Sequence, residues 1–443
     1  MKFKDFFNED YTVNWDRIEK LYYFERLKTT PQSSTWHQEG DAYKHTQNVV
    51  SELSVILNEN GIQCGSDEWI MCMVAAICHD LGKADTTKWS DEKKDWTTKN
   101  HGVVGERITR NLFFDEEIIM REKVCYMVRH HMTLHHVFDN DEKVFIKLAK
   151  LSHGIVPIKY LLYLKKADSL GSKNDIETSE FIEIKYNQVL SLCAVLDCYD
   201  KPYSLIDKSD LIRDFIGYEG TPNKNNDFCV YILCGFPGCG KTTYINEYLK
   251  DKKVISRDII RCELGIGGAT KENDKKVVGT KEEEDKVSEI FDEKMLECCY
   301  NKESFVLDNT NLKYQYRKEY LKKIMKFNPL VKIIYIEAPH YIFTCKQRRA
   351  GQIPNFVFDR MDDNFDFPQL YECNELVIYK EQIDGDDQII KFSSDFSPKN
   401  VKLEQKILND LRKTKGAMIL DGYDCYDSCI KYMDELIKKY EKE

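Results

Sequence analysis

The sequence predicts two domains of different fold class: an α-helical N-terminal domain and a C-terminal α/β domain with a parallel sheet. At 443 residues, the chain exceeds the roughly 100–200 residues usual for one domain. Its first half spaces apolar residues three and four apart, as amphipathic helices do, whereas its second half alternates short apolar runs with such helices. We expect domains at 1–216 and 228–395, a linker at 217–227 and a helical tail of unassigned role at 396–443.

Five segments of the N-terminal domain carry helical periodicity, and no alternating strand pattern competes with it. They are Tyr43–Asn58, Asp67–Cys78, Gly102–Phe113, Glu117–His131 and Val156–Asp168. The linker, GYEGTPNKNND, combines Gly, Pro, Asn and charge without periodicity, which is typical of a connecting segment. After it, four apolar runs predict parallel strands: FCVYILC, KVIS, SFVLD and VKIIYIEA. Within the tail we expect helices at 401–414 and 426–440.

Charge and cysteine content restrict the function classes. The net charge of −10 argues against a protein that holds nucleic acid by bulk electrostatics, so any polynucleotide site must be locally basic or metal-assisted. The sixteen cysteines are scattered and form no CxxC pair, which indicates reduced thiols in a cytoplasmic protein. No apolar run reaches the ~20 residues that span a bilayer, so we expect no membrane partner.

Nine of the ten histidines lie within the first 153 residues, and several of them, with two aspartates, fall at predicted helix ends. These residues are His45, His79, Asp80, His101, His130, His131 and Asp168. Imidazole and carboxylate groups suit divalent transition metals such as Mn²⁺, Co²⁺, Ni²⁺, Fe²⁺ or Zn²⁺, and helix ends that converge at one end of a bundle can supply them. The adjacent His79–Asp80 pair is informative, because one carboxylate can bridge two ions that activate a water and clamp a phosphate oxygen.

This pattern resembles the HD phosphohydrolase superfamily, whose signature is H…HD…D with a further H…H in the dinuclear branch. The resemblance spans about residues 35–175 and implies an α-helical HD domain that holds two divalent transition metal ions. The implied ligands are His45, His79, Asp80, His101, His130 and Asp168. His130 and His131 lie about 100° apart around a helix, so both can face one metal only if the helix end unwinds, and we assign His130.

Other residues of the HD region are expected to act beside the ligands. Asp80 is predicted to take part in catalysis, and Lys83 of the HDLGK phrase to meet the substrate phosphate. The segment before the first ligand contains His37, Glu39 and Asp41, which can line the mouth of the site.

The phrase GFPGCGKT follows an apolar strand and precedes a helix, which is the context that a phosphate-binding loop requires. Its glycines let backbone N–H groups turn toward the phosphates of ATP, while Lys241 reaches the β and γ oxygens and the Thr242 hydroxyl binds Mg²⁺. The predicted nucleotide contacts are Gly235, Gly238, Gly240, Lys241, Thr242 and Thr243. The motif predicts nucleotide binding and leaves the phosphate acceptor open.

The acceptor side follows the next strand, in the phrase SRDIIR. It places Asp258 at the strand's carboxyl end, where ligands of open α/β sheets bind. A carboxylate there can take the proton of an attacking hydroxyl, and Arg261, one turn on, can hold a phosphate beside that hydroxyl. We therefore predict that Asp258 is the general base of a kinase, with Lys241 and Arg261 also catalytic.

This SRDxxR phrase resembles the 5′-hydroxyl polynucleotide kinases of the phage type, which implies that Arg261 grips the phosphate of the acceptor. The phrase VLDNTN is similar to that family's DxTN segment, so Asp308 and Asn311 are expected to line the acceptor side. The phrase KQRR, ahead of an Ile-Pro step, looks like the family's lid, in which Arg348 or Arg349 contacts ATP. A glycine stands where the family's second lid arginine is expected, which leaves the choice between the two open.

The domain order resembles the end-healing enzymes that fuse an HD phosphatase to a polynucleotide kinase. That resemblance implies phosphorylation of 5′-OH ends with ATP and Mg²⁺, and removal of 3′-phosphate, 2′-phosphate or 2′,3′-cyclic phosphate, on RNA or DNA ends that a polynucleotide ligase then joins. Two other functions stay open: a nucleoside or metabolite kinase fused to an HD nucleotidase, and a nucleotide-sensing regulatory module. The acidic charge favours the small-molecule kinase, whereas Arg261 argues against it, because a bare nucleoside offers no phosphate to grip.

Overall fold

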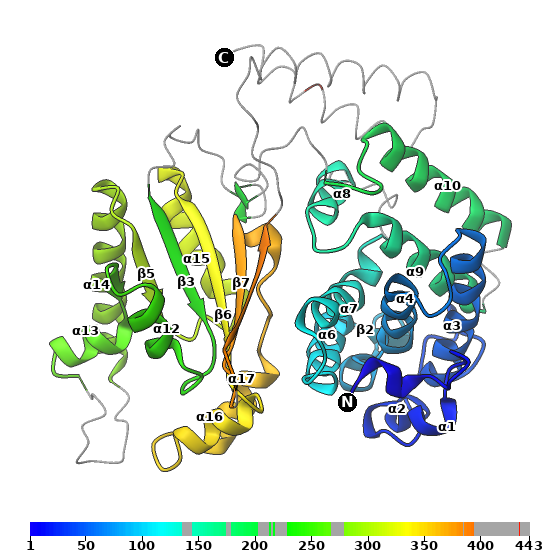
Figure 1. The fold of residues 1–443 in the computed structure, drawn as a ribbon, viewed down its shortest axis with the longest axis horizontal. Coiled ribbons are helices and arrows are strands. Elements are labelled where there is room, and N and C mark those ends of the chain that lie inside the picture. The colour runs from blue at the N-terminus through cyan, green and yellow to red at the C-terminus, as the bar shows by residue number, and fades with distance from the viewer. Residues whose placement is uncertain are drawn as a thin grey trace. The chain divides into compact units, whose positions relative to one another are not determined.

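The computed structural model describes residues 1–134, 144–173, 179–202, 212–213, 216–217, 228–266, 279–383, 385–393 and 434. These residues form two compact units, one within Met1–Ile206 and one within Asp207–Asp395 (Figure 1). Arg213, which the sequence assigned to the first domain, donates a hydrogen bond to Asn328 of the second unit, so the second unit begins before the predicted linker. That linker, apart from Gly217, and the predicted tail, apart from Asp434, lie outside the described residues.

The first unit is a helical bundle, which confirms the predicted class. Its helices are η1 (Phe3–Phe6), α1 (Trp15–Ile18), α2 (Tyr22–Leu27), α3 (Ala42–Glu59), α4 (Asp67–Cys78), α5 (Lys83–Thr86), α6 (His101–Leu112), α7 (Ile118–His130), η2 (His131–Leu134), α8 (Val144–Ser152), α9 (Ile158–Gly171) and α10 (Ser179–Val195). The five predicted helices correspond to α3, α4, α6, α7 and α9, with ends shifted by three residues at most.

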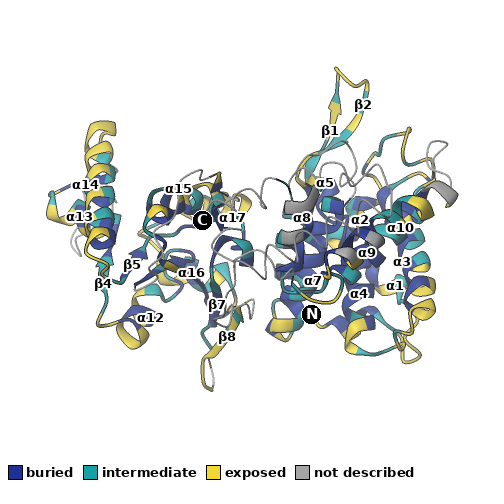
Figure 2. Ribbon diagram, turned by 90° about the horizontal axis from the view of Figure 1, so that it is seen from above, coloured by how far each residue is buried: buried dark blue, intermediate teal, exposed yellow. Residues whose placement is uncertain are grey.

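Helix α4 is the central helix of this bundle. Every residue from Met71 to Cys78 is buried, as expected of a helix that is apolar on all sides, and α3, α7 and α9 contact it (Figure 2). Ser66 caps its N-terminus by accepting a hydrogen bond from the Trp69 N–H. Because burial fixes this helix, the His79–Asp80 pair that follows it begins from a rigid element.

Buried charges join helices α6 and α7. Arg110 pairs with Glu122 at 2.7 Å and with Glu106 at 2.9 Å, while Arg121 lies 2.9 Å from Glu122 and Arg129 lies 2.6 Å from Glu106. Burial alone would raise the pKa of Glu122, yet the guanidinium groups of Arg110 and Arg121 hold that pKa below its usual value. Loss of one partner would leave an uncompensated buried charge, so the network fixes the two helices as a pair.

A β-hairpin lies between α5 and α6, and the sequence did not predict it. Strands β1 (Thr87–Ser90) and β2 (Asp95–Thr98) pair antiparallel, with Trp89 opposite Trp96. Each strand has four residues and no apolar alternation, so neither carries a strand signal. Figure 2 shows the hairpin projecting from the body of the first unit.

The second unit is an α/β domain with a mostly parallel sheet, as predicted. Its strands are β3 (Cys229–Cys234), β4 (Lys253–Ile255), β5 (Phe305–Asp308), β6 (Leu330–Glu337), β7 (Glu375–Lys380) and β8 (Gln388–Ser393). Its helices are α12 (Lys241–Tyr248), α13 (Arg257–Glu263), α14 (Lys281–Tyr300), α15 (Tyr314–Ile324), η3 (Met325–Phe327), α16 (Ile342–Arg348), α17 (Asn355–Asp363) and η4 (Leu370–Glu372). Among the described residues no helix of either unit has the length and apolarity needed to cross a membrane.

The strand order within the described residues is β4-β5-β3-β6-β7-β8, with β8 antiparallel to β7. Helix α12 leads from β3 across β5 to β4, whereas α15 leads from β5 across β3 to β6 in the opposite direction. Right-handed crossovers then require these helices on opposite faces of the sheet, which agrees with Figure 2. The carboxyl ends of β4, β5 and β3 meet at one edge, and ligands of open α/β sheets bind at such an edge.

Candidate active sites

The first candidate site lies where several helix ends of the bundle meet. His45 belongs to the first turn of α3, the His79–Asp80 pair follows α4, and Asp168 lies in the last turn of α9. His101 begins α6, and His131 begins the 3₁₀ turn η2 that follows α7. All six side chains are less than a tenth exposed. Residues that are far apart in the sequence thus form one buried cluster.

The two carboxylate oxygens of Asp80 face different histidine pairs. Oδ2 lies 3.7 Å from His45 Nε2 and 3.2 Å from His79 Nε2. Oδ1 lies 3.6 Å from His101 Nε2 and 4.0 Å from His131 Nε2. Two ligand atoms held ~2.1 Å from one ion are about 3.0–3.4 Å apart, so each side of Asp80 has nearly the dimensions of a metal site.

Asp168 completes the first of these groups. Its Oδ1 lies 2.9 Å from His45 Nε2 and 3.7 Å from His79 Nε2. Two sets of three ligand atoms around Asp80 could each hold an ion: His45, His79 and Asp168 form one, and Asp80, His101 and His131 form the other. A third set, His37, Glu39 and His45, shares His45 with the first. The carboxylate of Asp80 lies between the first two sets, as the sequence predicted for a bridging ligand.

The histidine rings turn their Nε2 lone pairs toward these two positions. The Nδ1 atoms of His79 and His131 each lie 2.7 Å from a backbone carbonyl oxygen three residues earlier. A carbonyl can only accept, so these Nδ1 atoms carry the protons. His101 Nδ1 also faces a carbonyl, at 3.5 Å, which leaves the Nε2 atoms of His101 and His131 as two acceptors only 3.0 Å apart. This donor set fits metal ions, because ligating histidines commonly have their tautomer fixed by a backbone carbonyl.

The pKa values of the clustered histidines also favour metal binding. Burial lowers the pKa of His101 to about 4 and that of His131 well below its usual value, so both rings are neutral at pH 7, as metal ligands must be. Burial also acts to lower the pKa of His45, but Asp168 and Glu39 outweigh it and raise that pKa to about 9. The His45 position therefore favours a cation, either a proton or a metal ion.

The assignment of His130 is corrected to His131. Helix α7 ends at His130, and the tighter 3₁₀ turn that begins at the next residue directs the His131 ring into the cluster. His130 lies outside both ligand groups; its Nδ1 is 3.3 Å from Thr133 Oγ1, and its ring packs 4.5 Å from Tyr126. Neighbouring helical residues point about 100° apart, so the cluster accommodates one of the two, and helical spacing alone could not show which.

Glu39 and Lys83 lie beside the ligands. The buried Glu39 carboxylate is 3.0 Å from His45 Nδ1 and 2.9 Å from His37 Nδ1, so it orients the His45 ring in the manner of an outer-sphere carboxylate. Lys83 Nζ forms an ion pair with Asp80 Oδ2 at 2.7 Å, but the angle between them does not make a hydrogen bond. The same Nζ donates a hydrogen bond to the Gln32 side chain at 2.8 Å. Lys83 is buried and contacts Asp80 directly, which the sequence did not predict.

Gly82, in the HDLGK phrase, is required for steric reasons. Its φ of −72° is an ordinary value for any residue. A methyl group at this position, however, would lie 2.0 Å from the His101 carbonyl oxygen and 2.7 Å from the Gly105 amide nitrogen. Both obstacles are backbone atoms of α6, so no side chain can move to make room. The glycine lets the turn after His79–Asp80 press against the helix that His101 begins.

We therefore expect Gly82→Ala to displace α6 and with it the second ligand group. Overpacking of this kind costs about 1–3 kcal/mol, and the shift should lower the amount of divalent metal that the second ligand group binds. Thermal unfolding and metal analysis of the purified variant check this. A Gly82→Ala protein with wild-type stability and full metal content would show that the close contact does not constrain the site.

The second candidate site begins at the phosphate-binding loop between β3 and α12. Gly238 and Gly240 have φ of 82° and 106°, values that side chains other than glycine rarely adopt, so the glycine spacing is a backbone requirement. Lys241 Nζ donates to two carbonyl groups of the loop, each at 3.0 Å. Thr242 and Thr243 are exposed in the first turn of α12, where helix N–H groups favour phosphate oxygens.

Asp258 and Arg261 lie in α13, which follows β4; in the sheet, β5 separates β4 from β3, the strand that leads into the loop. The Asp258 side chain is 71% exposed, and Arg261 Nη1 donates to it at 2.7 Å. Glu284 of α14 accepts two bonds of 2.8 and 2.7 Å from Arg261 Nε and Nη2. Asp308 ends β5; burial raises its pKa, Lys241 opposes the rise, and the charge of Asp258 adds to it. Asp308 is thus close enough to Lys241 and Asp258 for both to affect its pKa.

Asn311 does not have the predicted position on the acceptor side. Its side chain is 2% exposed, and its Nδ2 donates to the carbonyl oxygens of Leu233 at 2.7 Å and Leu307 at 3.4 Å. With φ of 47°, it occupies the left-handed region that asparagine tolerates better than most residues. Its amide therefore ties the ends of β3 and β5 together instead of meeting an acceptor.

The lid arginines both lie against the phosphate-binding loop. Arg348 donates to the Gly238 carbonyl at 3.2 Å, and its guanidinium makes bonds of 2.8 and 2.6 Å with Glu381. A methyl group on Gly238 would lie 3.2 Å from Arg349 Cγ, while the Arg349 guanidinium donates to Gln352 at 2.9 Å. Both arginines thus lie beside the loop, and Glu381 is a partner of Arg348 that no sequence motif indicated.

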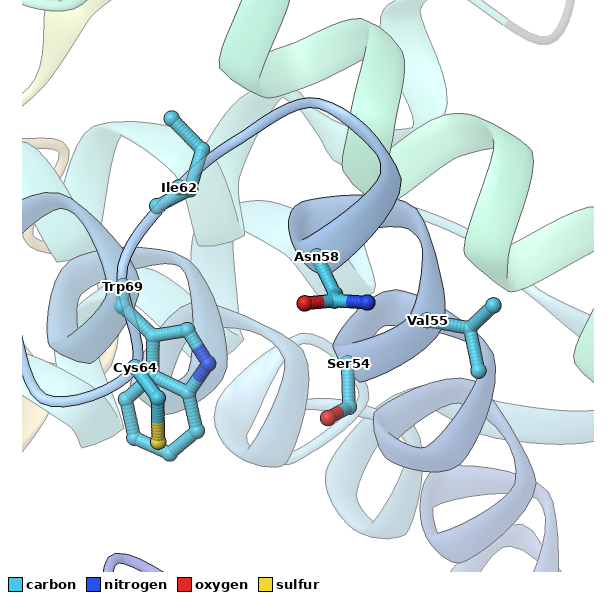
Figure 3. Close-up of a pocket in the computed structure, with 6 residues that line it drawn as sticks. All are labelled: Ser54, Val55, Asn58, Ile62, Cys64 and Trp69. Carbon is cyan, nitrogen blue, oxygen red and sulfur yellow. The ribbon is translucent and has the colours of Figure 1, made fainter.

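A hollow of about 320 Å³ in the first unit has none of the clustered histidines and aspartates in its lining (Figure 3). Its lining comes from the second half of α3, the segment after it and the first turn of α4, and consists of Ser54, Val55, Asn58, Ile62, Cys64 and Trp69. None of these residues was predicted to act in either site.

Comparisons with known protein families agree with the division of the chain into two units. The HD domain family matches residues 43–171, and an AAA domain family matches residues 230–368. The fold and the sites thus define a two-domain class: an HD hydrolase domain followed by a P-loop, kinase-like domain. The chain combines one domain of each kind, in the predicted order.

Solved structures give only a distant likeness. The crystal structure of AvrRxo1-ORF1:AvrRxo1-ORF2 with sulphate ions is 12% identical, with 52% of this chain and 82% of that chain covered and a TM-score of 0.24. The corresponding complex with ATP is also 12% identical, with 58% and 90% covered and a TM-score of 0.25. A likeness this weak identifies no shared function. No curated protein matches the chain.

Proposed function

We propose that this chain heals nucleic-acid ends. Its kinase-like domain would phosphorylate 5′-OH ends with ATP, and its HD domain would remove a 3′-phosphate, 2′-phosphate or 2′,3′-cyclic phosphate. The observation that carries the proposal is the contact of 2.7 Å between Asp258 and Arg261 at the edge of the sheet that bears the phosphate-binding loop. A base beside a phosphate-binding cation suits a hydroxyl with a phosphate neighbour, as in a polynucleotide. A polynucleotide ligase would then use the healed ends.

In the HD domain, the six clustered side chains are the proposed metal ligands. They are His45, His79, Asp80, His101, His131 and Asp168. Divalent transition metal ions such as Mn²⁺, Co²⁺, Ni²⁺, Fe²⁺ or Zn²⁺, when bound there, would lower the pKa of a water molecule and neutralise phosphate oxygens. Lys83 holds a positive charge 2.7 Å from Asp80, where it can attract the substrate phosphate, and Glu39 keeps the His45 ring in place.

In the kinase-like domain, Lys241 and the lid arginines would neutralise the β- and γ-phosphates of ATP, and the Thr242 hydroxyl would hold Mg²⁺. Asp258 would accept the proton of the 5′-OH. Glu284 binds Arg261 through Nε and Nη2, so Nη1 can exchange Asp258 for the phosphate of the acceptor. That exchange would release the Asp258 carboxylate at the moment when the hydroxyl arrives.

An oligonucleotide with a 5′-OH and a 3′-phosphate tests both halves at once. We expect the 5′ end to gain a phosphate only with ATP and Mg²⁺, and the 3′ end to lose its phosphate with a transition metal and without ATP. RNA and DNA versions tested in parallel identify the preferred polymer. A folded preparation that changes neither end of either polymer under these conditions would contradict the proposal.

The acceptor preference separates this proposal from a small-molecule kinase. A charge-assisted hydrogen bond contributes about 1.5–3 kcal/mol, so a 3′-nucleoside monophosphate should have kcat/KM about 10- to 100-fold above that of the bare nucleoside. Arg261→Gln should remove most of this difference, whereas Lys250→Gln, which removes an exposed cation after α12, should preserve it. Equal kcat/KM for the two acceptors in the wild type would favour the small-molecule kinase.

A further inference from the structure

Three tryptophans of the first unit are unusually exposed. Trp36 is 45% exposed, Trp89 51% and Trp96 37%, whereas Trp69 is buried. Indole is the largest side chain, and leaving it in water forgoes much of the hydrophobic gain of folding, so a group of exposed indoles indicates a binding surface. We call these three residues the tryptophan group.

The tryptophan group belongs to two segments that are joined to each other. Trp89 and Trp96 face each other across the hairpin with ring centroids 5.5 Å apart. Trp36 lies in a turn whose Ser33 carbonyl accepts from the Trp36 N–H at 3.3 Å. The Ser33 hydroxyl in turn donates to Asp95, next to Trp96. One hydrogen bond thus links the turn and the hairpin into a single surface.

Both segments also lead directly to the metal cluster. His37, next to Trp36, packs its ring 4.7 Å from that of His45. Gln32, at the start of the same segment, accepts from Lys83 at 2.8 Å, and Lys83 contacts Asp80. The hairpin itself connects α5, which begins at Lys83, with α6, which begins at His101. The tryptophan group therefore stands where a substrate would approach the ligands.

The hairpin and its flanks carry a small excess of positive charge, in contrast to the net charge of the chain. The hairpin and its flanks carry four exposed lysines, at positions 88, 93, 94 and 99. Three acidic residues lie among these lysines: Asp91 accepts from Trp89 Nε1 and Asp95 from Ser33, while Glu92 is exposed. Exposed aromatic rings interspersed with lysines are the features of single-strand nucleic-acid surfaces, where bases stack on rings and cations follow the backbone.

We infer that Trp36, Trp89 and Trp96 form a stacking platform for the bases of a single-stranded polynucleotide whose phosphorylated end enters the HD site. The inference rests on the proposed function and adds the surface that selects a polymer over a mononucleotide. The Trp89–Trp96 pair also stabilises the hairpin, as cross-strand aromatic pairs do. Trp36 lies outside the hairpin, so hairpin stability does not account for its exposure.

Fluorescence anisotropy with a labelled single-stranded 10-mer bearing a 3′-phosphate tests the platform on the full chain. Each of Trp36→Leu and Trp89→Leu should raise Kd by on the order of 10-fold, the effect of losing one stacked base. Trp36→Tyr and Trp89→Tyr should restore most of the affinity. Tyr300→Leu, which removes a 70% exposed ring from the other unit, should change nothing.

The kinetics provide a second readout. In phosphate release, the leucine variants should raise KM for the 10-mer by the same factor as Kd, with kcat and the hydrolysis of p-nitrophenyl phosphate unchanged. Wild-type affinity for the 10-mer in both leucine variants would overturn the inference. If the leucine variants bind the 10-mer normally but no longer self-associate in sedimentation, the tryptophan group is a protein interface. That result would overturn the inference as well.

Failure of the platform is distinguishable from failure of the proposed function. If the wild type hydrolyses the small phosphate ester and the 10-mer with equal kcat/KM and binds no oligonucleotide, the platform is wrong and a phosphatase remains. If the wild type releases no phosphate from any substrate, the end-healing proposal is wrong. The anisotropy comparison still decides, in that case, whether the tryptophan group binds single strands.

Discussion

Asp80→Asn is expected to lower phosphate release by about 10³-fold or more while phosphorylation by the kinase-like domain changes less than twofold. The substitution preserves the shape of the side chain but removes the charge whose two oxygens face His45 and His79 on one side and His101 and His131 on the other. Each metal ion contributes several kcal/mol of charge stabilisation in such sites, and about 1.4 kcal/mol corresponds to tenfold in rate. If Asp80 bridges two ions, as its two oxygens allow, its loss would affect both at once.

The measurement combines phosphate release, kinase activity and metal content of the same preparation. Glu59→Gln, which neutralises an exposed carboxylate at the end of α3, should resemble the wild type in all three. Circular dichroism and thermal unfolding establish that the first unit is folded. A folded Asp80→Asn protein that has lost both activities would contradict the assignment of the activities to separate domains.

Asp258→Asn is expected to lower kcat of the kinase by about 10²–10⁴-fold, the usual contribution of a general base. This loss corresponds to about 3–5 kcal/mol of barrier. The KM for ATP should stay nearly constant, because Asp258 lies on the acceptor side and contributes in the transition state rather than to nucleotide binding. Phosphate release by the HD domain should not respond to this substitution.

Asp251→Asn is the matched control, because Asp251 is an exposed aspartate just before β4 and has no proposed role. Lys241→Ala should by contrast weaken the stabilisation of the transferred phosphate itself. If Asp258→Asn retains more than about a tenth of the wild-type kcat, well short of the loss expected for a base, Asp258 only supports the N-terminus of α13. Asp308 would then be the next candidate, since burial already raises its pKa.

The sequence was most informative where chemistry depends on neighbouring residues. The phosphate-binding loop and the His79–Asp80 pair are local phrases, and the structure has the loop between a strand and a helix and the pair in a ligand cluster, as expected. The choice between His130 and His131 could not be made from the sequence, because it depends on where α7 changes into a 3₁₀ turn. That change follows from packing in three dimensions, which helical periodicity does not report.

Residues that act through distant partners were also beyond sequence reasoning. Glu284 belongs to an acidic run in the first turn of α14, which is indistinguishable from ordinary helix N-terminal charge, yet it binds Arg261. Asn311 has the residue type that the DxTN segment requires, but its side-chain amide donates to backbone carbonyls of two strands. The hairpin was missed because its strands have only four residues each. The pairing of Trp89 with Trp96 across the two strands leaves no periodic pattern in the sequence.

Both ligand groups of the HD cluster use the His79–Asp80 pair at the end of α4, and the carboxylate of Asp80 lies between them. The first group adds side chains from α3 and α9. The second adds His101 and His131 from the pair α6–α7, which the buried arginine–glutamate network and the Gly82 contact hold as one body. If each group holds one ion, as proposed, metal stoichiometry would be a separable trait of this architecture. Substitutions confined to the α6–α7 pair would then convert a two-ion centre into a one-ion centre without disturbing the central helix, so related chains could diverge in ion number while they keep the same core.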